Sequence, residues 1–414
     1  MARHAKTLIA GIAIATVMSA ASYADDTTDI ENIQFLNVGP FDSTVILVVE
    51  DVETVAGQAG VLGNTLSVDY TLGNVNVSNS QTLDASGYAE SVVDVNIATM
   101  GATSTAYGFG NSATISTCCG NIVSNSTQVV AAGNLIGAES DLNILNWAMN
   151  PNSSAIATAN AISTTTAYGG TLDSTIIQDN EASVTSRSLI DAGGVFADSA
   201  TVVSTAIANT GFAGGGQTTT NVNVNQTSNG PTVRAIGGLY GPSVEDAIVA
   251  TIAAGNNFSI ENSYGVVRSD VTQENSAYIN AQTDVDMGVW GNYNSASAYA
   301  IANSNLTSNI GDDIFVDNIQ LNTGDVEALA EFASNGAGGV GYSPVQVVSS
   351  AAFGNAVSGY VCSVCEGAIT ANNNQTNSAS ITSTTNITAS NGGNVIGTAT
   401  AIGNSATFHS NTGE

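Results

Sequence analysis

Two short stretches, Ala300-Ile301-Ala302-Asn303 and Gln320-Leu321-Asn322-Thr323-Gly324, decide how this chain folds. The Asn that ends the first stretch belongs to a series of eight: Asn64, Asn111, Asn160, Asn209, Asn256, Asn303, Asn355 and Asn404. The Gln that begins the second stretch belongs to another: Gln34, Gln81, Gln128, Gln178, Gln226, Gln273, Gln320 and Gln375. The two series interlock and keep step along the chain, which indicates an internal repeat of about eight units of about 48 residues.

The residues around each Asn alternate in size. The residue before the Asn is Gly or Ala in all eight units, and the residue two before it is mostly large and apolar. A period of two is typical of a β-strand and is not kept by a helix. The pattern predicts a strand with positions −1 and −3 on one side and positions −2, 0 and +2 on the other. The small-residue side fits either an interface with another sheet or the tight interior of a narrow coil.

This repeat predicts an all-β protein, specifically a repetitive β-solenoid that resembles a parallel β-helix. Equivalent amides of successive coils would stack about 4.8 Å apart as Asn and Gln ladders, which satisfy buried amides. Because 48 residues are long for one turn, we expect two or three coils per unit and a rod of about 80–110 Å. A row of separate β-sandwich domains is the alternative.

The N-terminus is typical of a secretory signal peptide. Arg3 and Lys6 precede an apolar run from residue 7 to residue 21, and Ser22-Tyr23-Ala24 supplies the small residues of a cleavage site. We therefore expect a signal peptide over residues 1–24, a repetitive β-solenoid domain over residues 25–414, and an exported protein.

Composition excludes several classes of function. The 414 residues include 5 Lys+Arg and 34 Asp+Glu, a formal charge of −29, which argues against nucleic acid and anionic lipid as partners. After cleavage the only His is His409, so we expect no catalytic site, no metal site and no cofactor. Arg187, Arg234 and Arg268 lie in different repeats and are expected to be solvated or to pair with a nearby carboxylate.

The four cysteines form two pairs, Cys118-Cys119 and Cys362-x-x-Cys365. Both pairs begin seven residues after a ladder Asn and so occupy the same corner, five units apart. Even one coil per unit would separate them by about 24 Å, far beyond disulfide reach. A local Cys362–Cys365 disulfide is expected in an oxidising compartment. A vicinal Cys118–Cys119 bond and intermolecular bonds remain as alternatives.

The Gln-x-Asn-x-Ala pattern, as in Gln178, Asn180 and Ala182, occurs together with Gly-Asn-Ser-Ala at residues 110–113 and 403–406. These motifs resemble the curlin-type repeats of bacterial extracellular fibres. The whole chain, with its signal peptide and its acidic Ala/Asn/Ser/Thr-rich repeats, resembles the holdfast anchor protein HfaD family of stalked alphaproteobacteria. That resemblance implies an outer-membrane-associated, cell-surface protein. It would work with sibling anchor proteins and a curli-type export pore to fasten adhesive polysaccharide to the cell pole.

The sequence therefore predicts a non-enzymatic surface anchor or adhesin whose faces and edges bind sibling proteins or polysaccharide. The alternative is a curlin-like fibre subunit that self-associates through the ends of its solenoid. A polysaccharide-degrading β-helix enzyme fits less well, because such an enzyme needs basic residues that this chain largely lacks.

Overall fold

The computed structural model describes residues 27–37, 39–193, 196–334, 345–363, 367–389 and 393–412. Strands make up nearly all of this part of the chain, and every pairing between them is parallel. The all-β prediction is therefore confirmed. No helix that could cross a bilayer occurs in the described residues. The predicted signal peptide, residues 1–24, lies outside them.

The strands form two sheets. The first, here called the short sheet, has eight strands: β1 (Thr28–Leu36), β3 (Val75–Leu83), β5 (Ile122–Val130), β8 (Gly170–Asn180), β11 (Thr218–Ser228), β13 (Val267–Asn275), β16 (Ile314–Asn322) and β19 (Ile369–Asn377). The second, the long sheet, has thirteen: β2 (Phe41–Tyr70), β4 (Gly87–Thr117), β6 (Leu135–Ala148), β7 (Asn152–Thr166), β9 (Ser183–Ala192), β10 (Phe196–Gly216), β12 (Thr232–Ser263), β14 (Tyr278–Trp290), β15 (Tyr293–Ile310), β17 (Val326–Ser334), β18 (Val345–Ser363), β20 (Ile381–Ala389) and β21 (Asn394–Thr412).

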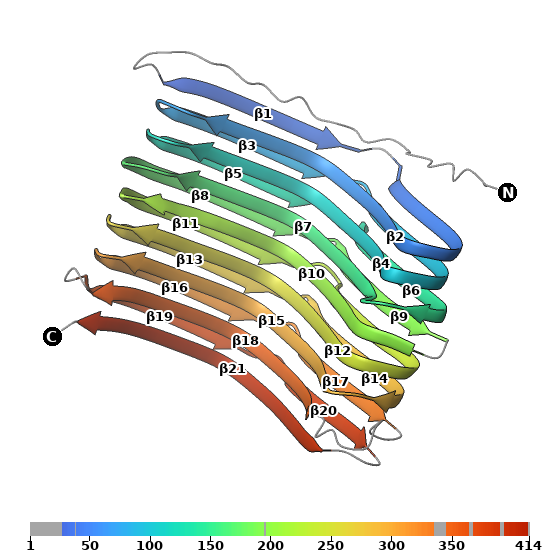
Figure 1. The fold of residues 1–414 in the computed structure, drawn as a ribbon. Helices are drawn as coiled ribbons and strands as arrows, with labels where there is room; N and C mark the ends of the chain where they lie inside the picture. The colour runs from blue at the N-terminus through green and yellow to red at the C-terminus, as the bar shows by residue number, and fades with distance from the viewer. Residues whose placement is uncertain are drawn as a thin grey trace.

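Each repeat forms one coil of a stack. The chain runs along a short-sheet strand, turns, and then makes two passes through the long sheet before it returns to the short sheet one layer further on (Figure 1). We call the first pass limb 1, residues 41–49 and those paired with them. The second pass is limb 2, residues 55–70 and those paired with them. Some repeats cross both limbs in one long strand, such as β2, and others in two, such as β6 and β7.

The prediction of two or three coils per repeat is wrong. The strands pair in register with the equivalent strands one repeat later, for example Gln34 with Gln81 and Asn64 with Asn111. One repeat is therefore one coil, and eight coils span about 34 Å from the first strand to the last rather than 80–110 Å. The period in the sequence could not reveal this, because it does not show that a single strand reaches 30 residues. The same in-register pairing along the whole stack rules out separate β-sandwich domains.

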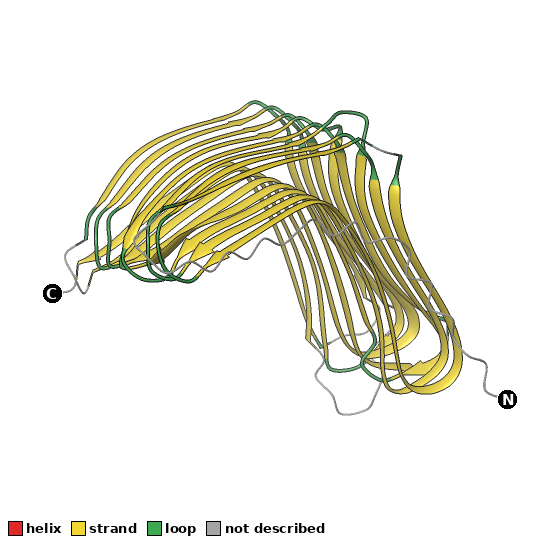
Figure 2. Cartoon of the chain, turned by 90° about the horizontal axis from the view of Figure 1, so that it is seen from above, coloured by secondary structure: helices red, strands yellow, loops and turns green. Residues whose placement is uncertain are grey.

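Each coil is flat and bent, as Figure 2 shows along the stack. Limb 2 is the layer that the other two segments share. Limb 1 packs against the first part of limb 2 through residues such as Val93 and Ala106, which belong to one apolar cluster. The short sheet packs against the last part of limb 2 through a second cluster, which includes Val77 and Ile115.

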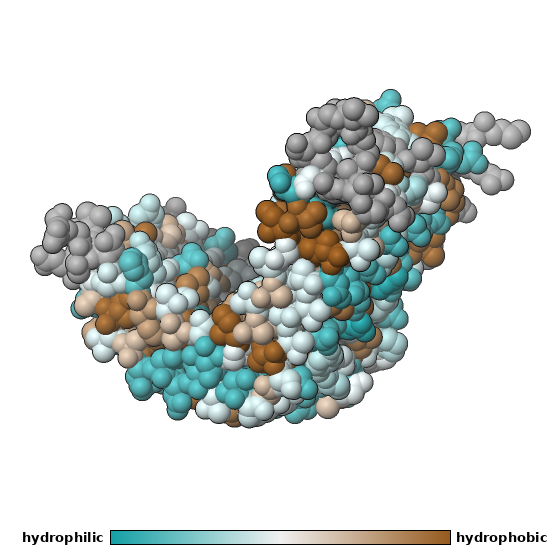
Figure 3. Space-filling model, turned by 90° about the horizontal axis from the view of Figure 1, so that it is seen from below, coloured by the Kyte–Doolittle hydropathy of each residue, from teal (hydrophilic) through white to brown (hydrophobic). Residues whose placement is uncertain are grey.

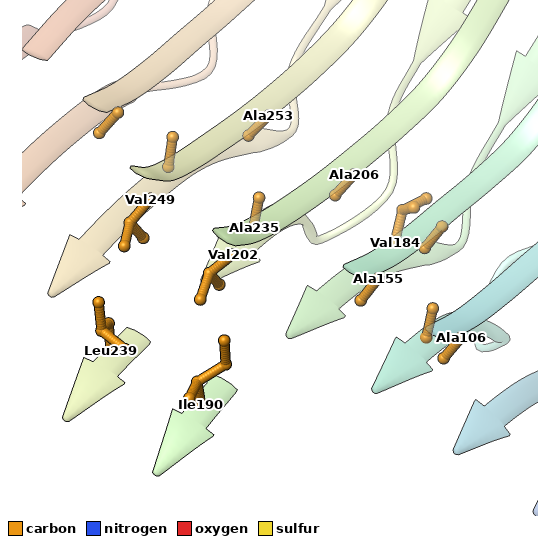
Figure 4. Packing of buried hydrophobic residues seen from close by; sticks show 14 of the residues in the cluster. Ala106, Ala155, Val184, Ile190, Val202, Ala206, Ala235, Leu239, Val249 and Ala253 are labelled. Carbon is orange, nitrogen blue, oxygen red and sulfur yellow. The ribbon is translucent and has the colours of Figure 1, made fainter. Parts of the chain in front are cut away.

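The small-residue positions lie inside the stack. Ala206, Ala253 and Ala300, at position −3, have no exposed surface, and Figure 4 shows Ala206 and Ala253 beside Val202 and Val249 in the apolar cluster. The two layers approach closely there, so larger side chains would not fit. Of the two interpretations of this face, the interior of a narrow coil is confirmed.

Limb 2 changes its inward-facing side at each ladder Asn. Ala208 and Asn209 are neighbours in the chain, yet both are fully buried, and so are Ala302 and Asn303. The strand pairing skips position −1 at every step along the ladder. The predicted placement of positions −1 and 0 on opposite sides is therefore wrong. This local irregularity in the strand also explains why position −1 is Gly or Ala. A Cβ built on Gly110, for example, would lie 2.5 Å from the carbonyl oxygen of Ala159 in the next coil.

Several aromatic rings lie over glycines of the adjacent coil. Phe258 pairs in register with Gly211, and a Cβ at Gly211 would meet the Phe258 ring at 2.4 Å. Tyr88 covers Gly137 in the same way on the outer face of limb 1. Coils spaced about 4.8 Å apart leave no room for a side chain beneath a flat ring, so these glycines are needed for packing.

Candidate functional site

The structure brings the eight ladder Asn residues into one row inside the stack. From Asn64 to Asn355, the side-chain Nδ2 of each donates to the Oδ1 of the next, at 2.7–2.9 Å. The second N–H of each of these amides bonds across to the short sheet. Asn111, for example, donates to Asn160 and also to the carbonyl of Val129, both at 2.9 Å. The Asn row therefore ties each coil to the next and ties the two sheets together.

The eight ladder Gln residues form a second row, in the short sheet, with the opposite polarity. Each Gln from Gln81 onward donates from Nε2 to the Oε1 of the Gln before it, at 2.7–2.8 Å. The other N–H crosses to limb 2, as when Gln128 donates to the carbonyl of Ala161 at 2.9 Å. One row donates toward the C-terminal end of the stack and the other toward the N-terminal end.

The Asn of the Gln-x-Asn-x-Ala pattern has a separate role at the turn after the short strand. Asn180 Nδ2 donates to the carbonyl of Ala182, and the Ala182 N–H donates back to Asn180 Oδ1. Asn275 makes the same turn contact and also donates to Asn322 of the next coil, at 2.8 Å. The spacing in the sequence reflects this turn, which orients the chain from the short sheet into limb 1.

A groove runs along the outer face of the short sheet. Its walls are the side chains five and three residues before each ladder Gln, which we call row −5 and row −3. A hollow of about 660 Å³ extends from β5 to β19, and another of about 230 Å³ extends from β1 to β5. Both are lined by Val123 and Asn125, so they form one feature, here called the axial groove. Sequence reasoning missed it, because the Asn, Ser, Thr and Asp residues that mark row −3 are frequent throughout the chain.

Charge is distributed unevenly along the axial groove. Asp270 and Asp317 are register partners, so two carboxylates face the groove in adjacent coils. Asn372 Nδ2 donates a hydrogen bond to Asp317 Oδ1 at 3.1 Å, so Asp317 has a neutral amide as its partner on the other side. The guanidinium of Arg268 lies 5.3 Å from the centre of the Phe315 ring, a cation–π contact.

The three arginines outside the predicted signal peptide differ in their partners. Arg187 forms ion pairs with Glu139 and Asp141 on limb 1, as expected. Burial raises the pKa of Asp141 above its ordinary value, and the guanidinium partly offsets this effect. Arg234 and Arg268 are both exposed to solvent, as expected, and Arg234 also donates to Asn280 and Gln282, at 3.1 and 3.2 Å. The in-register neighbour on an adjacent coil is a partner in each case: Glu139 for Arg187, Asn280 for Arg234 and Phe315 for Arg268.

Among the described residues, the cysteines and His409 do not assemble into a reactive group. Cys118 and Cys119 are free thiols, so the alternative of a vicinal bond between them is wrong. Cys365 lies outside the described residues, so the predicted Cys362–Cys365 disulfide stays a prediction. His409 stacks on Tyr360, with ring centres 5.8 Å apart. Within the described ranges, no three or more His, Cys, Asp or Glu side chains are placed to hold a metal ion.

We predict that Asn160→Leu lowers the free energy of unfolding by about 2–4 kcal/mol, because it removes one rung and leaves buried groups unpaired. Those groups include the Asn209 Oδ1 and the Asp179 carbonyl. Urea denaturation followed by circular dichroism measures the change. The matched control is Asn404→Leu in the exposed last rung, which we expect to cost less than about 1 kcal/mol. Equal losses from the two variants would contradict a buried, bonded ladder.

Comparison with known proteins gives one informative result. No curated protein and no solved structure matches the chain. A protein family described as HfaD, holdfast attachment protein D, matches residues 49–325, which is more than half of the chain and runs from β2 to the turn before β17. This match confirms the resemblance that the repeats and composition indicate. The chain therefore belongs to the HfaD family, whose role is holdfast attachment at the cell surface.

Proposed function

We propose that the chain is a non-enzymatic anchor that fastens adhesive holdfast polysaccharide to the outer membrane. The match to the holdfast attachment family over residues 49–325 is the observation that carries this proposal. We further propose that the stack is a β-solenoid and that residues 1–24 direct its export. In this proposal the protein works with sibling anchor proteins and a curli-type export pore.

The architecture supports a mechanical and binding role rather than a catalytic one. Adjacent coils are joined by parallel backbone pairing in both sheets and by the two amide rows. Such a stack holds outward-facing side chains in straight rows with a fixed spacing of about 4.8 Å. Fixed rows on a stiff support suit the binding of a long partner at many points, in which weak contacts add up.

Deletion of the gene tests this proposal. We expect deletion cells to shed adhesive polysaccharide into the medium and to attach poorly to a surface, and the full chain supplied in trans to restore both. Attachment assays and staining of shed polysaccharide measure the outcome. Polysaccharide that stays on the deletion cells, with unchanged attachment, would contradict an anchoring role.

A second candidate, end-to-end self-association, is favoured by the ends of the amide rows. In the described residues, no strand pairs with the outer edge of β1 or of β19. No donor from the same ranges reaches Asn64 Oδ1 at one end or Gln375 Oε1 at the other. If a second copy continued the stack in register, Asn404 could donate to its Asn64, and its Gln34 could donate back to Gln375.

Apolar side chains are exposed at both ends as well. Ile33 and Phe35 in the first coil are 72% and 63% exposed, and Ile396 in the last coil is 48% exposed. Figure 3 looks onto the C-terminal end of the stack, where apolar side chains lie among polar ones. Uncovered edge strands with apolar neighbours are prone to pair with another chain.

We expect the purified protein to form head-to-tail oligomers that grow with concentration. Combining Gln375→Lys with Asn404→Lys should block this growth, because it places charge at the terminal rungs. Thr407→Lys, an exposed change on the same coil, is the matched control and should not block it. Analytical ultracentrifugation measures the size. A wild-type protein that stays monomeric at every concentration tested would reject this candidate.

A further inference from the structure

The axial groove has the shape of a site for a long ligand. The shared residues Val123 and Asn125 join its two hollows, so it passes over all eight short strands, a length of about 34 Å. Its walls repeat with every coil, because rows −5 and −3 recur once in each. A channel that offers similar groups at regular intervals fits a linear polymer better than a compact small molecule.

The sheet beneath the groove determines how such a polymer could be held. The groove lies on the face of the short sheet, and its strands use their backbone N–H and C=O groups to pair with one another. A peptide that binds by strand addition needs an unpaired edge, and this face has none. The ligand must therefore bond to side chains.

Those side chains are the kind that recognise hydroxyl groups. Row −3 carries Asp, Glu, Asn, Ser or Thr in every coil, including Asn125, Thr175 and Asn223. Amides and hydroxyls both donate and accept hydrogen bonds, as do the hydroxyls of a sugar. Phe315, 38% exposed in the groove, adds an apolar surface of the kind that packs against the C–H face of a sugar ring.

Charge excludes one class of polymer. Asp29 and Glu31 line the first hollow, and Asp173, Asp270 and Asp317 line the second, against the single cation Arg268. Carboxylates in adjacent coils repel an anionic chain that lies along them. Polymers with phosphate or uronate groups are therefore disfavoured.

We infer that the axial groove binds a linear, non-anionic polysaccharide that lies along the stack, with its hydroxyls hydrogen-bonded to row −3. This inference rests on the proposed anchoring function and assigns it to one face of the molecule. It leaves the ends of the stack free for other contacts.

The test uses polysaccharide shed into the medium by the deletion cells and purified full-length protein. We expect the wild-type protein to bind this polysaccharide. The triple variant Asn125→Ala, Thr175→Ala, Asn223→Ala should bind about tenfold or more weakly, because it removes three side chains that hydrogen-bond to the polymer. All three side chains point outward, so the melting temperature should be unchanged.

The matched control is Ser112→Ala, Ser163→Ala, Ser259→Ala. These residues line a smaller hollow of about 320 Å³ on the outer face of limb 2, and we expect this variant to bind like the wild type. Oligo-alginate, a linear chain of carboxylated sugars, should not compete for the wild-type protein. A groove variant that binds as tightly as the wild type, or competition by oligo-alginate, would overturn the inference.

The two proposals fail in different ways. If deletion cells shed polysaccharide but the purified protein does not bind it, anchoring stands and the groove assignment is wrong, because attachment then runs through another protein. If deletion cells shed nothing and attach normally, the anchoring function itself is wrong, and the groove assignment falls with it.

Discussion

In-register stacking of identical amides is the interaction on which the rest of the structure depends. One coil per repeat places each ladder Asn beside an Asn and each ladder Gln beside a Gln, so every interior amide of the two rows finds a partner of the right kind. The second N–H of each amide then bonds to the backbone of the opposite layer, as Asn209 does with Thr227 and Gln226 with Asn257. Together these bonds set the spacing of the coils and hold the short sheet against limb 2. The layers can therefore be thin and filled with Ala and Val, because their alignment does not depend on large apolar side chains.

The same register creates a problem for a chain with a formal charge of −29, since like charges would stack on one another. On the outer faces, amides alternate with carboxylates from coil to coil, which reduces the repulsion between stacked like charges. Asn76 donates to Asp29, Asn143 to Asp94 and Asn221 to Asp173, each across one coil step. On limb 1, Glu90 and Glu139 are register partners in adjacent coils. Arg187 occupies the same position in the following coil and forms an ion pair with Glu139. Row −3, which holds Asp270 and Asp317, contains no such cation. Their negative charges are therefore not neutralised within the row, and the axial groove is locally acidic.

Much of the fold could be predicted from the sequence, because stacking by translation turns a repeat period directly into contacts. The eight Asn and eight Gln positions mark the rows that the structure places inside the stack. The coil count could not be predicted, since nothing in the period distinguishes a 30-residue strand such as β2 from two short ones. The change of inward side between Ala208 and Asn209 was also hidden, because it depends on where the strand bends against its partner layer. The axial groove escaped notice because its residues are common in the chain and gain meaning only when they are aligned across coils.

The central claim, one coil per repeat, can be tested with a single distance. Nitroxide labels at Asp29→Cys and Thr370→Cys, in a chain whose four native cysteines are changed to Ser, mark row −5 in the first and last coils. Pulsed electron spin resonance measures the distance between the labels. Seven steps of one coil each predict about 34 Å between the two labelled positions, lengthened only by the label arms. A distance near 70 Å, as two coils per repeat would require, would contradict this account of the stack.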